Sequence, residues 1–211
     1  MWRGPAMTMR THELHPSLVH APLVLLPAAA LVDLAAALRP RDRRLDRLGR
    51  NLWWGAASAG LAAGLTGMAA SQEIELRSTH AREMMFAHGI GNLCIVLAAA
   101  GVSGWRARNH ANLTSALSGL LAAGAAGYTA YLGGELVYTH GAGVTALGGA
   151  AAESPPLFSA HGMARLGRDA GRGLGWLLQR AYRAVTSRER VQRSALGPIA
   201  EAGTGAEPEI H

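Results

Sequence analysis

The chain has 211 residues, of which 49% are hydrophobic and only 16% are charged. Between Pro16 and Gly133 the charged residues gather in three short clusters, whereas a soluble domain would scatter charge along the outer faces of its helices. The net charge of +6 is not accompanied by an aromatic-rich basic stretch, so the composition argues against a nucleic-acid platform and favours lipid surroundings.

Four stretches of the sequence are long and apolar enough to cross a bilayer, which takes about 20 helical residues. They run over residues 16–38, 52–70, 84–105 and 113–132, the last with an extension to Tyr138. Trp53 and Trp54 open the second stretch and are expected to act as interfacial anchors. The sequence therefore predicts an all-α fold, an integral membrane four-helix bundle.

The arginines of the short loops predict the orientation of this bundle. Residues 39–50 carry six Arg against two Asp, and the loop after the third stretch adds two more Arg. Cytoplasmic loops are enriched in basic residues, so these loops are expected to face the cytoplasm of a bacterial inner membrane. Both termini then lie on the extracytoplasmic side. Asp33, near the inner end of the first stretch, is expected to pair with Arg39 or Arg43.

The placement of histidine is the most informative feature of the sequence. Five of the nine histidines fall at the predicted outer face, at positions His15, His20, His80, His88 and His140. Histidine is common at membrane interfaces, where its polar tip stays wet. An ionisable side chain inside the apolar region is costly, however, and is therefore a candidate for function.

His20 and His88 are the pair that the spacing favours. Each lies four residues inside the start of its stretch, counted from Pro16 and Met84, or roughly 6 Å deep. The first and third stretches run in the same direction, so the two imidazoles are expected at matched depth, as axial ligands of a haem would be. Asn92, one turn beyond His88, would orient the ring or a propionate.

The remaining polar residues at this face are expected to support the pair. His15, His80 and His140 are further candidate cofactor ligands. Glu135 shares a helix face with Tyr131 and Tyr138, and its carboxylate is a candidate hydrogen-bond partner for an imidazole.

The single cysteine, Cys94, excludes an internal disulfide and a CxxCH haem attachment site. Lying mid-helix among apolar residues, it is expected to be buried and inert.

The chain is expected to divide into three parts. Residues 1–12 form an N-terminal tail, residues 13–145 the transmembrane domain, and residues 146–211 a linker, an amphipathic helix and a partly irregular tail. The helix is predicted over residues 162–186, where an apolar stripe lies beside arginines. This pattern is typical of an interfacial helix or of a docking helix for a partner subunit.

Two motifs carry a family resemblance. The segment 15–23 reads HPSLVHAPL and the segment 133–144 reads GGELVYTHGAGV. They resemble the HPxxVHxP start and the GGxLVYxHGxGV end of an uncharacterised bacterial family of four-helix membrane domains, over about residues 12–145. Members of that family are sometimes fused to Rieske iron–sulfur domains, which implies a place near quinol or cytochrome electron transfer. This chain differs from the fused members because its tail has no ligand cysteines.

The leading functional expectation is a membrane subunit of a respiratory electron-transfer complex. It would bind haem b through His20 and His88 and pass electrons between another membrane or periplasmic redox subunit and quinone or another carrier. One alternative is a copper or zinc site on the same imidazoles, and another is a cofactor-free anchor or assembly subunit. A non-catalytic subunit is expected, because the sequence has no nucleophile–base pairing, phosphate loop or paired carboxylates.

Overall fold

The computed structural model describes residues 11–149 and 159–186. Within these residues the chain is helical and has no β-strand, which confirms the all-α expectation. The helices are α1 (Thr11–Leu18), α2 (His20–Leu38), α3 (Arg43–Ala70), α4 (Thr79–Arg106), α5 (Leu113–Tyr138), the short 3-10 helix η1 (Thr145–Leu147) and α6 (Ala160–Val185).

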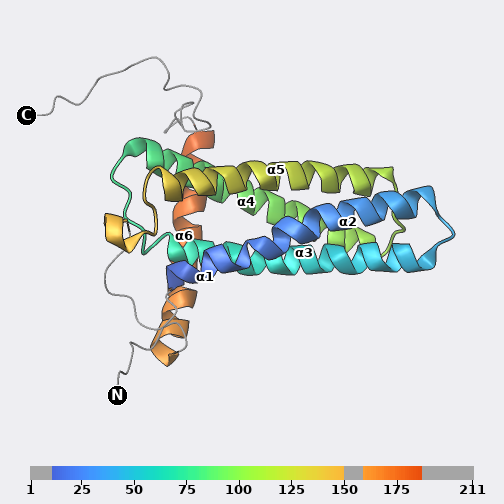
Figure 1. Ribbon diagram of the computed structural model, residues 1–211, viewed down its shortest axis with the longest axis horizontal. Helices are drawn as coiled ribbons and strands as arrows, with labels where there is room; N and C mark the ends of the chain where they lie inside the picture. The colour runs from blue at the N-terminus through green and yellow to red at the C-terminus, as the bar shows by residue number, and fades with distance from the viewer. Residues whose placement is uncertain (1–10, 150–158, 187–211) are drawn as a thin grey trace, which may run out of the picture.

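Helices α2 to α5 lie side by side, and each of them contacts two neighbours (Figure 1). Helix α2 packs between α3 and α5, and α4 packs between the same two helices from the other side. Helix α1 continues α2 along α3, and α6 crosses α3 and α4 near one end. We call this end, formed by α1 and residues 71–78 and 139–149, the histidine end. The opposite end, formed by residues 39–42 and 107–112, is called the arginine end.

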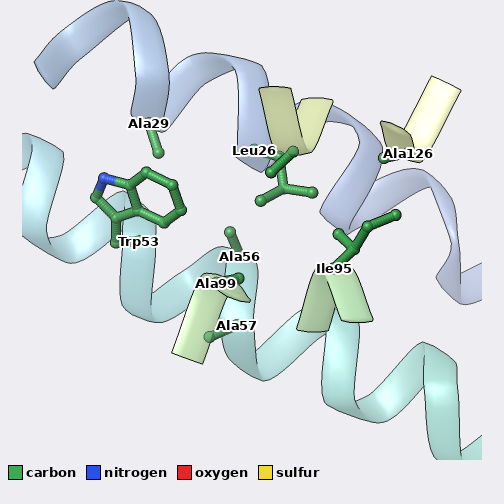
Figure 2. Close-up of a cluster of buried hydrophobic side chains, with 9 residues drawn as sticks. Leu26, Ala29, Trp53, Ala56, Ala57, Ile95, Ala99 and Ala126 are labelled. Atoms are coloured by element: carbon green, nitrogen blue, oxygen red, sulfur yellow. The ribbon is translucent and has the colours of Figure 1, made fainter. Parts of the chain in front are cut away.

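The interior is built from small side chains and the outer surface from large ones. Alanines of all four long helices are buried around Leu26, Ile95 and Trp53 (Figure 2). Leucines on the same helices point outward, among them Leu31, Leu61, Leu65, Leu97, Leu117 and Leu121. Close packing through small residues beneath a lipid-facing apolar surface is typical of helices in membranes. Two helical stretches, Glu13–Leu38 and Thr79–Arg106, are long and apolar enough to span a bilayer.

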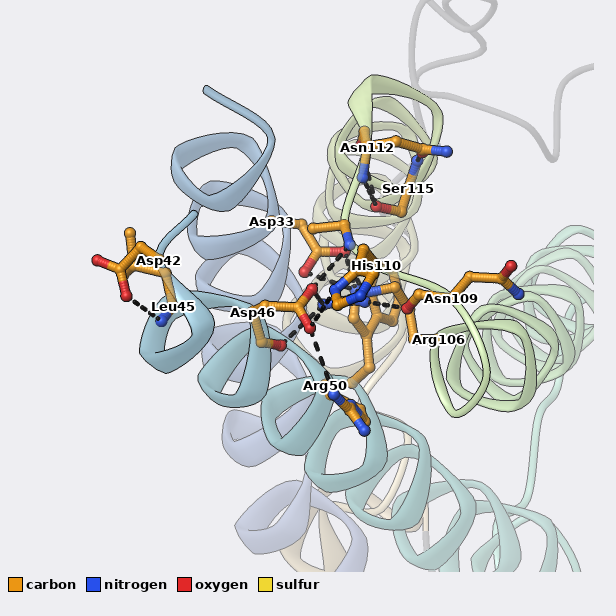
Figure 3. Close-up of polar contacts among 12 residues, drawn as sticks. Asp33, Asp42, Leu45, Asp46, Arg50, Arg106, Asn109, His110, Asn112 and Ser115 are labelled. Atoms are coloured by element: carbon orange, nitrogen blue, oxygen red, sulfur yellow. Dashed lines mark hydrogen bonds and ion pairs between the residues drawn. The ribbon is translucent and has the colours of Figure 1, made fainter. Parts of the chain in front are cut away.

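A cluster of buried charges ties three helices together at the arginine end (Figure 3). Arg106 Nε lies 3.0 Å from Asp33 Oδ2, and both side chains are fully buried. Trp53 Nε1 donates a hydrogen bond of 2.9 Å to the same carboxylate oxygen. Arg106 also pairs with Asp46, with 3.0 Å between Nη2 and Oδ1. Arg106 Nη2 also donates a hydrogen bond of 2.9 Å to the carbonyl of Asp46, so the cluster links α2, α3 and α4.

This cluster corrects two expectations. Asp33 pairs with Arg106 and not with Arg39 or Arg43, which are both exposed, because a carboxylate buried in an apolar interior needs its counter-charge at the same depth. Trp53 is not an interfacial anchor: its side chain is fully buried and satisfies Asp33. Trp54 is half exposed, as an anchor would be.

Asp46 extends the cluster into the loop before α5. Its carboxylate accepts hydrogen bonds from His110 Nδ1 at 3.0 Å and from the Ala111 N–H at 2.8 Å. Burial by itself would raise the pKa of Asp46, but the Ala111 N–H, the Arg106 charge and His110 outweigh it and hold the pKa below its usual value.

We predict that Asp33→Ala lowers the free energy of unfolding by about 3–5 kcal/mol, because Arg106 would be left buried without its main counter-charge. Asp42→Ala is the matched control. Asp42 only caps α3 through hydrogen bonds to the N–H groups of Arg44 and Leu45, and loss of such a cap costs about 1 kcal/mol. Unfolding of the purified protein in detergent measures both. Equal losses would contradict a dominant role for the Asp33–Arg106 pair.

Candidate functional site

Two imidazoles meet inside the histidine end. The rings of His15, from α1, and His88, from α4, have their centres 6.3 Å apart and their planes at 88°. Each ring is held by a helix other than its own, so its position depends on how the helices pack.

The His15 ring lies against α3. Its Nδ1 atom is 2.9 Å from the carbonyl oxygen of Ala63. Gly67 leaves room for the ring, because a Cβ atom at this glycine would lie 2.8 Å from His15 Cε1. Real Cβ atoms do not approach this closely, so a side chain at position 67 would displace the imidazole.

The His88 ring lies against α5 in a similar way. Its Nδ1 atom is 2.7 Å from the carbonyl oxygen of Thr129, and a Cβ atom at Gly133 would lie 3.0 Å from its Cε1 atom. Asn92 Nδ2 is 3.2 Å from His88 Nε2, and Thr129 Oγ1 donates to Asn92 Oδ1 at 3.0 Å. Asn92 therefore orients the His88 ring, as expected from its place one turn away.

These contacts decide which nitrogen of each ring is available. A carbonyl oxygen only accepts hydrogen bonds, so Nδ1 of both His15 and His88 carries a proton. In the neutral imidazoles the lone pair is then on Nε2. A backbone carbonyl on one ring nitrogen is also the arrangement that orients histidines at metal sites.

The expected pairing of His20 with His88 is not what the structure contains. His20 is exposed, and His15 occupies the place opposite His88. The helix begins at Thr11 and not near Pro16, so depth counted from Pro16 was misleading. His15 and His20 also point in different directions, because five residues along an α-helix rotate a side chain by about 140° around the helix axis.

A second pair of imidazoles lies at the same end. The ring centres of His80, near the start of α4, and His140, just after α5, are 5.5 Å apart with their planes at 59°. Glu135 accepts a hydrogen bond of 2.8 Å from the Thr139 hydroxyl.

Sequence reasoning missed the buried acids that α6 covers. Glu83 on α4 is buried and pairs with Arg180 of α6. The Arg180 guanidinium lies 5.1 Å from the centre of the Phe86 ring and 5.6 Å from that of Trp176. The signal was available in part, because Glu83 directly precedes the apolar stretch 84–105 and a buried acid needs a cation as its partner.

Helix α6 is docked closely on α3 and α4. Gly173 packs directly on the backbone of Met68. Leu177 lies on Gly89, where an added Cβ atom would be 3.2 Å from Leu177 Cδ1. The expected docking helix therefore packs on its own chain.

Cys94 is exposed, contrary to the expectation of a buried thiol. It lines an apolar groove between α4 and α5, on the outer side of the helices. Among the described residues, no group of three or more His, Cys, Asp or Glu is arranged to hold a metal ion.

Comparison with known proteins identifies the family. No curated protein and no solved structure matches the chain. The model of one family matches residues 11–146, the span that contains α1 to α5 and all four paired histidines. The chain therefore belongs to the family described as "Predicted membrane protein (DUF2231)".

Proposed function

We propose that the chain is a membrane subunit of an electron-transfer complex that binds haem b between His15 and His88. The observation that carries this proposal is the approach of these two imidazoles from separate helices. In the proposed arrangement α2 to α5 form a transmembrane four-helix bundle with both chain termini on the extracytoplasmic side. The histidine end is then the outer end.

The distance between the two rings supports shared ligation of one iron. Two imidazoles on opposite sides of a metal ion, with metal–nitrogen distances of about 2.0 Å, have ring centres roughly 6 Å apart. The His15 and His88 ring centres are separated by 6.3 Å. Bundle cores commonly present axial haem ligands from facing helices in this way.

The surroundings of the rings support the same role. The carbonyls of Ala63 and Thr129 hold the Nδ1 protons, which leaves Nε2 as the ligand atom. Gly67 and Gly133 let the two rings lie directly against α3 and α5, which a larger residue at either position would hinder. Asn92 occupies Nε2 of His88 with one hydrogen bond and would have to turn away for ligation. A bound haem would supply a one-electron redox centre near the outer surface, within reach of quinone or a partner redox subunit.

The orientation in the membrane is supported by charge and by α6. The arginine-rich segments 39–50 and 106–108 lie at the arginine end, which the positive-inside rule assigns to the cytoplasm. Helix α6 crosses the opposite end. Four large apolar side chains of α6 are exposed: Met163, Leu178, Tyr182 and Val185. Together they span about 100° of the helix circumference.

The arginines of α6 complete an interfacial pattern. Arg168, Arg172 and Arg183 are exposed and fill the next sector, roughly 60° wide. The docked face of α6, with Gly173 and Leu177, lies on the remaining side. A helix with one face on protein, one apolar and one basic fits the boundary between acyl chains and headgroups.

A cofactor-free anchor is the second candidate, and one observation favours it. His88 Nε2, Asn92 and Thr129 already form a hydrogen-bonded chain between α4 and α5. Such a network satisfies the buried polar groups without a ligand. In this candidate function the imidazoles only hold neighbouring helices together through hydrogen bonds.

The two candidates differ in their absorption spectra. We expect the purified protein to show a Soret band and a visible band that sharpens on reduction with dithionite. His15→Ala and His88→Ala should each shift the Soret band and abolish the sharp visible band of the reduced protein, or remove the haem, because a single remaining imidazole holds the iron on one side only. His20→Ala is the control and should leave the spectrum unchanged, since His20 is exposed.

A folded preparation without a Soret band, even after reconstitution with haem, would rule out the haem proposal. The anchor candidate would then be tested with the His15→Ala, His88→Ala double variant. If that variant still assembles with its membrane partners, the imidazoles have a structural role only.

The membrane orientation is tested by labelling single cysteines. In a Cys94→Ala background, Gln72→Cys and Arg41→Cys place exposed thiols at the histidine end and the arginine end. We expect a membrane-impermeant maleimide to label position 72 in intact spheroplasts, and position 41 only after the membrane is permeabilised. The reverse pattern would invert the proposed orientation, and labelling of both positions would contradict a spanning bundle.

A further inference from the structure

The second imidazole pair, His80 and His140, is built by a loop that folds back on the helices. After α5, Gly141 adopts φ +66° and Gly143 φ +77°, left-handed conformations that favour glycine. The Ala142 N–H donates to the carbonyl of Leu136 at 2.9 Å, which turns the chain sharply at the helix end. His140 lies at this turn and is carried toward the start of α4.

A second set of contacts anchors the loop to the segment before His80. The Gly143 N–H donates to the carbonyl of Gly149 at 3.0 Å, and the Glu75 N–H donates to the same carbonyl at 3.2 Å. Gly149 has no space for a side chain, because a Cβ atom would strike the carbonyl oxygen of Gly141. The loop and residues 71–78 are thus held together by backbone hydrogen bonds, which keep the backbones of His80 and His140 close to each other.

One nitrogen of this pair has no hydrogen bond within the part of the chain that the structure describes. This atom, His80 Nδ1, is buried and finds no partner among residues 11–149 and 159–186. A buried polar nitrogen without a partner is uncommon in folded proteins and calls for an explanation such as a bound ion. The rings of His15 and His88 differ in this respect, because the Nδ1 atom of each donates a hydrogen bond to a backbone carbonyl.

We propose that His80 and His140 bind a divalent late transition-metal ion, with Cu²⁺ preferred over Zn²⁺. Imidazole nitrogens suit both ions, and Cu²⁺ binds such ligands more tightly than its neighbours in the series. The ring centres, 5.5 Å apart, leave room for an ion coordinated by one nitrogen from each ring. No third His, Cys, Asp or Glu of the described residues joins the pair, so the proposed site takes one ligand nitrogen from each of the two imidazoles.

This site is separate from the proposed haem site. His80 precedes His88 by eight residues on α4, which is about 12 Å along the helix. The pair therefore lies nearer the outer surface, where an aqueous ion can reach it. Its occupation does not require that His15 and His88 bind anything.

The test is Cu²⁺ titration of the full chain in detergent, followed by electron paramagnetic resonance. We expect one equivalent of Cu²⁺ to show hyperfine splitting from two imidazole nitrogens. His140→Asn, at the edge of the loop, should remove one of the two nitrogen couplings and weaken binding at least tenfold. His80→Phe, which keeps the ring volume, should do the same.

His20→Asn is the matched control and should leave the signal unchanged, since this exposed histidine belongs to neither pair. Retention of thermal unfolding and of the gel-filtration profile identifies variants that still fold. If both folded variants bind Cu²⁺ with the same affinity and spectrum as the parent chain, the proposal is wrong. A Soret band that persists or is absent in these variants reports on His15 and His88 alone, so the two proposals fail independently.

Discussion

The buried ion pair between Asp33 and Arg106 is the contact on which the rest of the arrangement depends. Neither charge is stable in an apolar interior unless the other lies at the same depth. Asp33 follows His15 by 18 residues, and Arg106 follows His88 by 18 residues, or about five turns of helix. The Asp33–Arg106 pair therefore sets the depth of the two imidazoles along the bundle, and the direction in which they point, at the histidine end. The helical hydrogen bond from Val19 N–H to the His15 carbonyl, 3.2 Å long, carries this register from α2 into α1.

Small residues in the interior let the helices pack closely enough for the two imidazoles to reach neighbouring backbones. An imidazole reaches the carbonyl of a neighbouring helix only if the two backbones come close, and carbonyls within a helix are exposed to a neighbour only where side chains are small. Gly67 and Gly133 supply these gaps beside His15 and His88. Helices α2 and α5 pack equally closely at Gly119, where an added Cβ atom would lie 2.7 Å from that of Ala30. The rings are thus oriented by backbone carbonyls that hold Nδ1, and Nε2, which Asn92 contacts in His88, is the ligand nitrogen in the proposed pair.

Buried charges find their partners in different parts of the chain at the two ends of the molecule. At the arginine end the buried charges neutralise one another within α2, α3 and α4. At the histidine end Glu83 depends on Arg180 from α6, which comes 97 residues later in the chain. Helix α6 is therefore needed to neutralise an acid close to the imidazoles, and its docking joins the tail to the candidate site. This dependence links the C-terminal part of the chain, which lies outside the family match, to the chemistry of the matched part.

The helical class, the apolar central parts of the long helices and the gathering of histidines at one end could be predicted from the sequence, because apolar stretch length and glycine-rich turns are local properties. The sequence also placed Asn92 beside His88, since residues four apart share a helix face. The packing of the helices, by contrast, brings His15 rather than His20 opposite His88, buries Trp53 and pairs Asp33 with Arg106. Each of these depends on the rotation of one helix against another. That rotation is set by a single charge pair and by the places where backbones can touch, which no local pattern in the chain specifies.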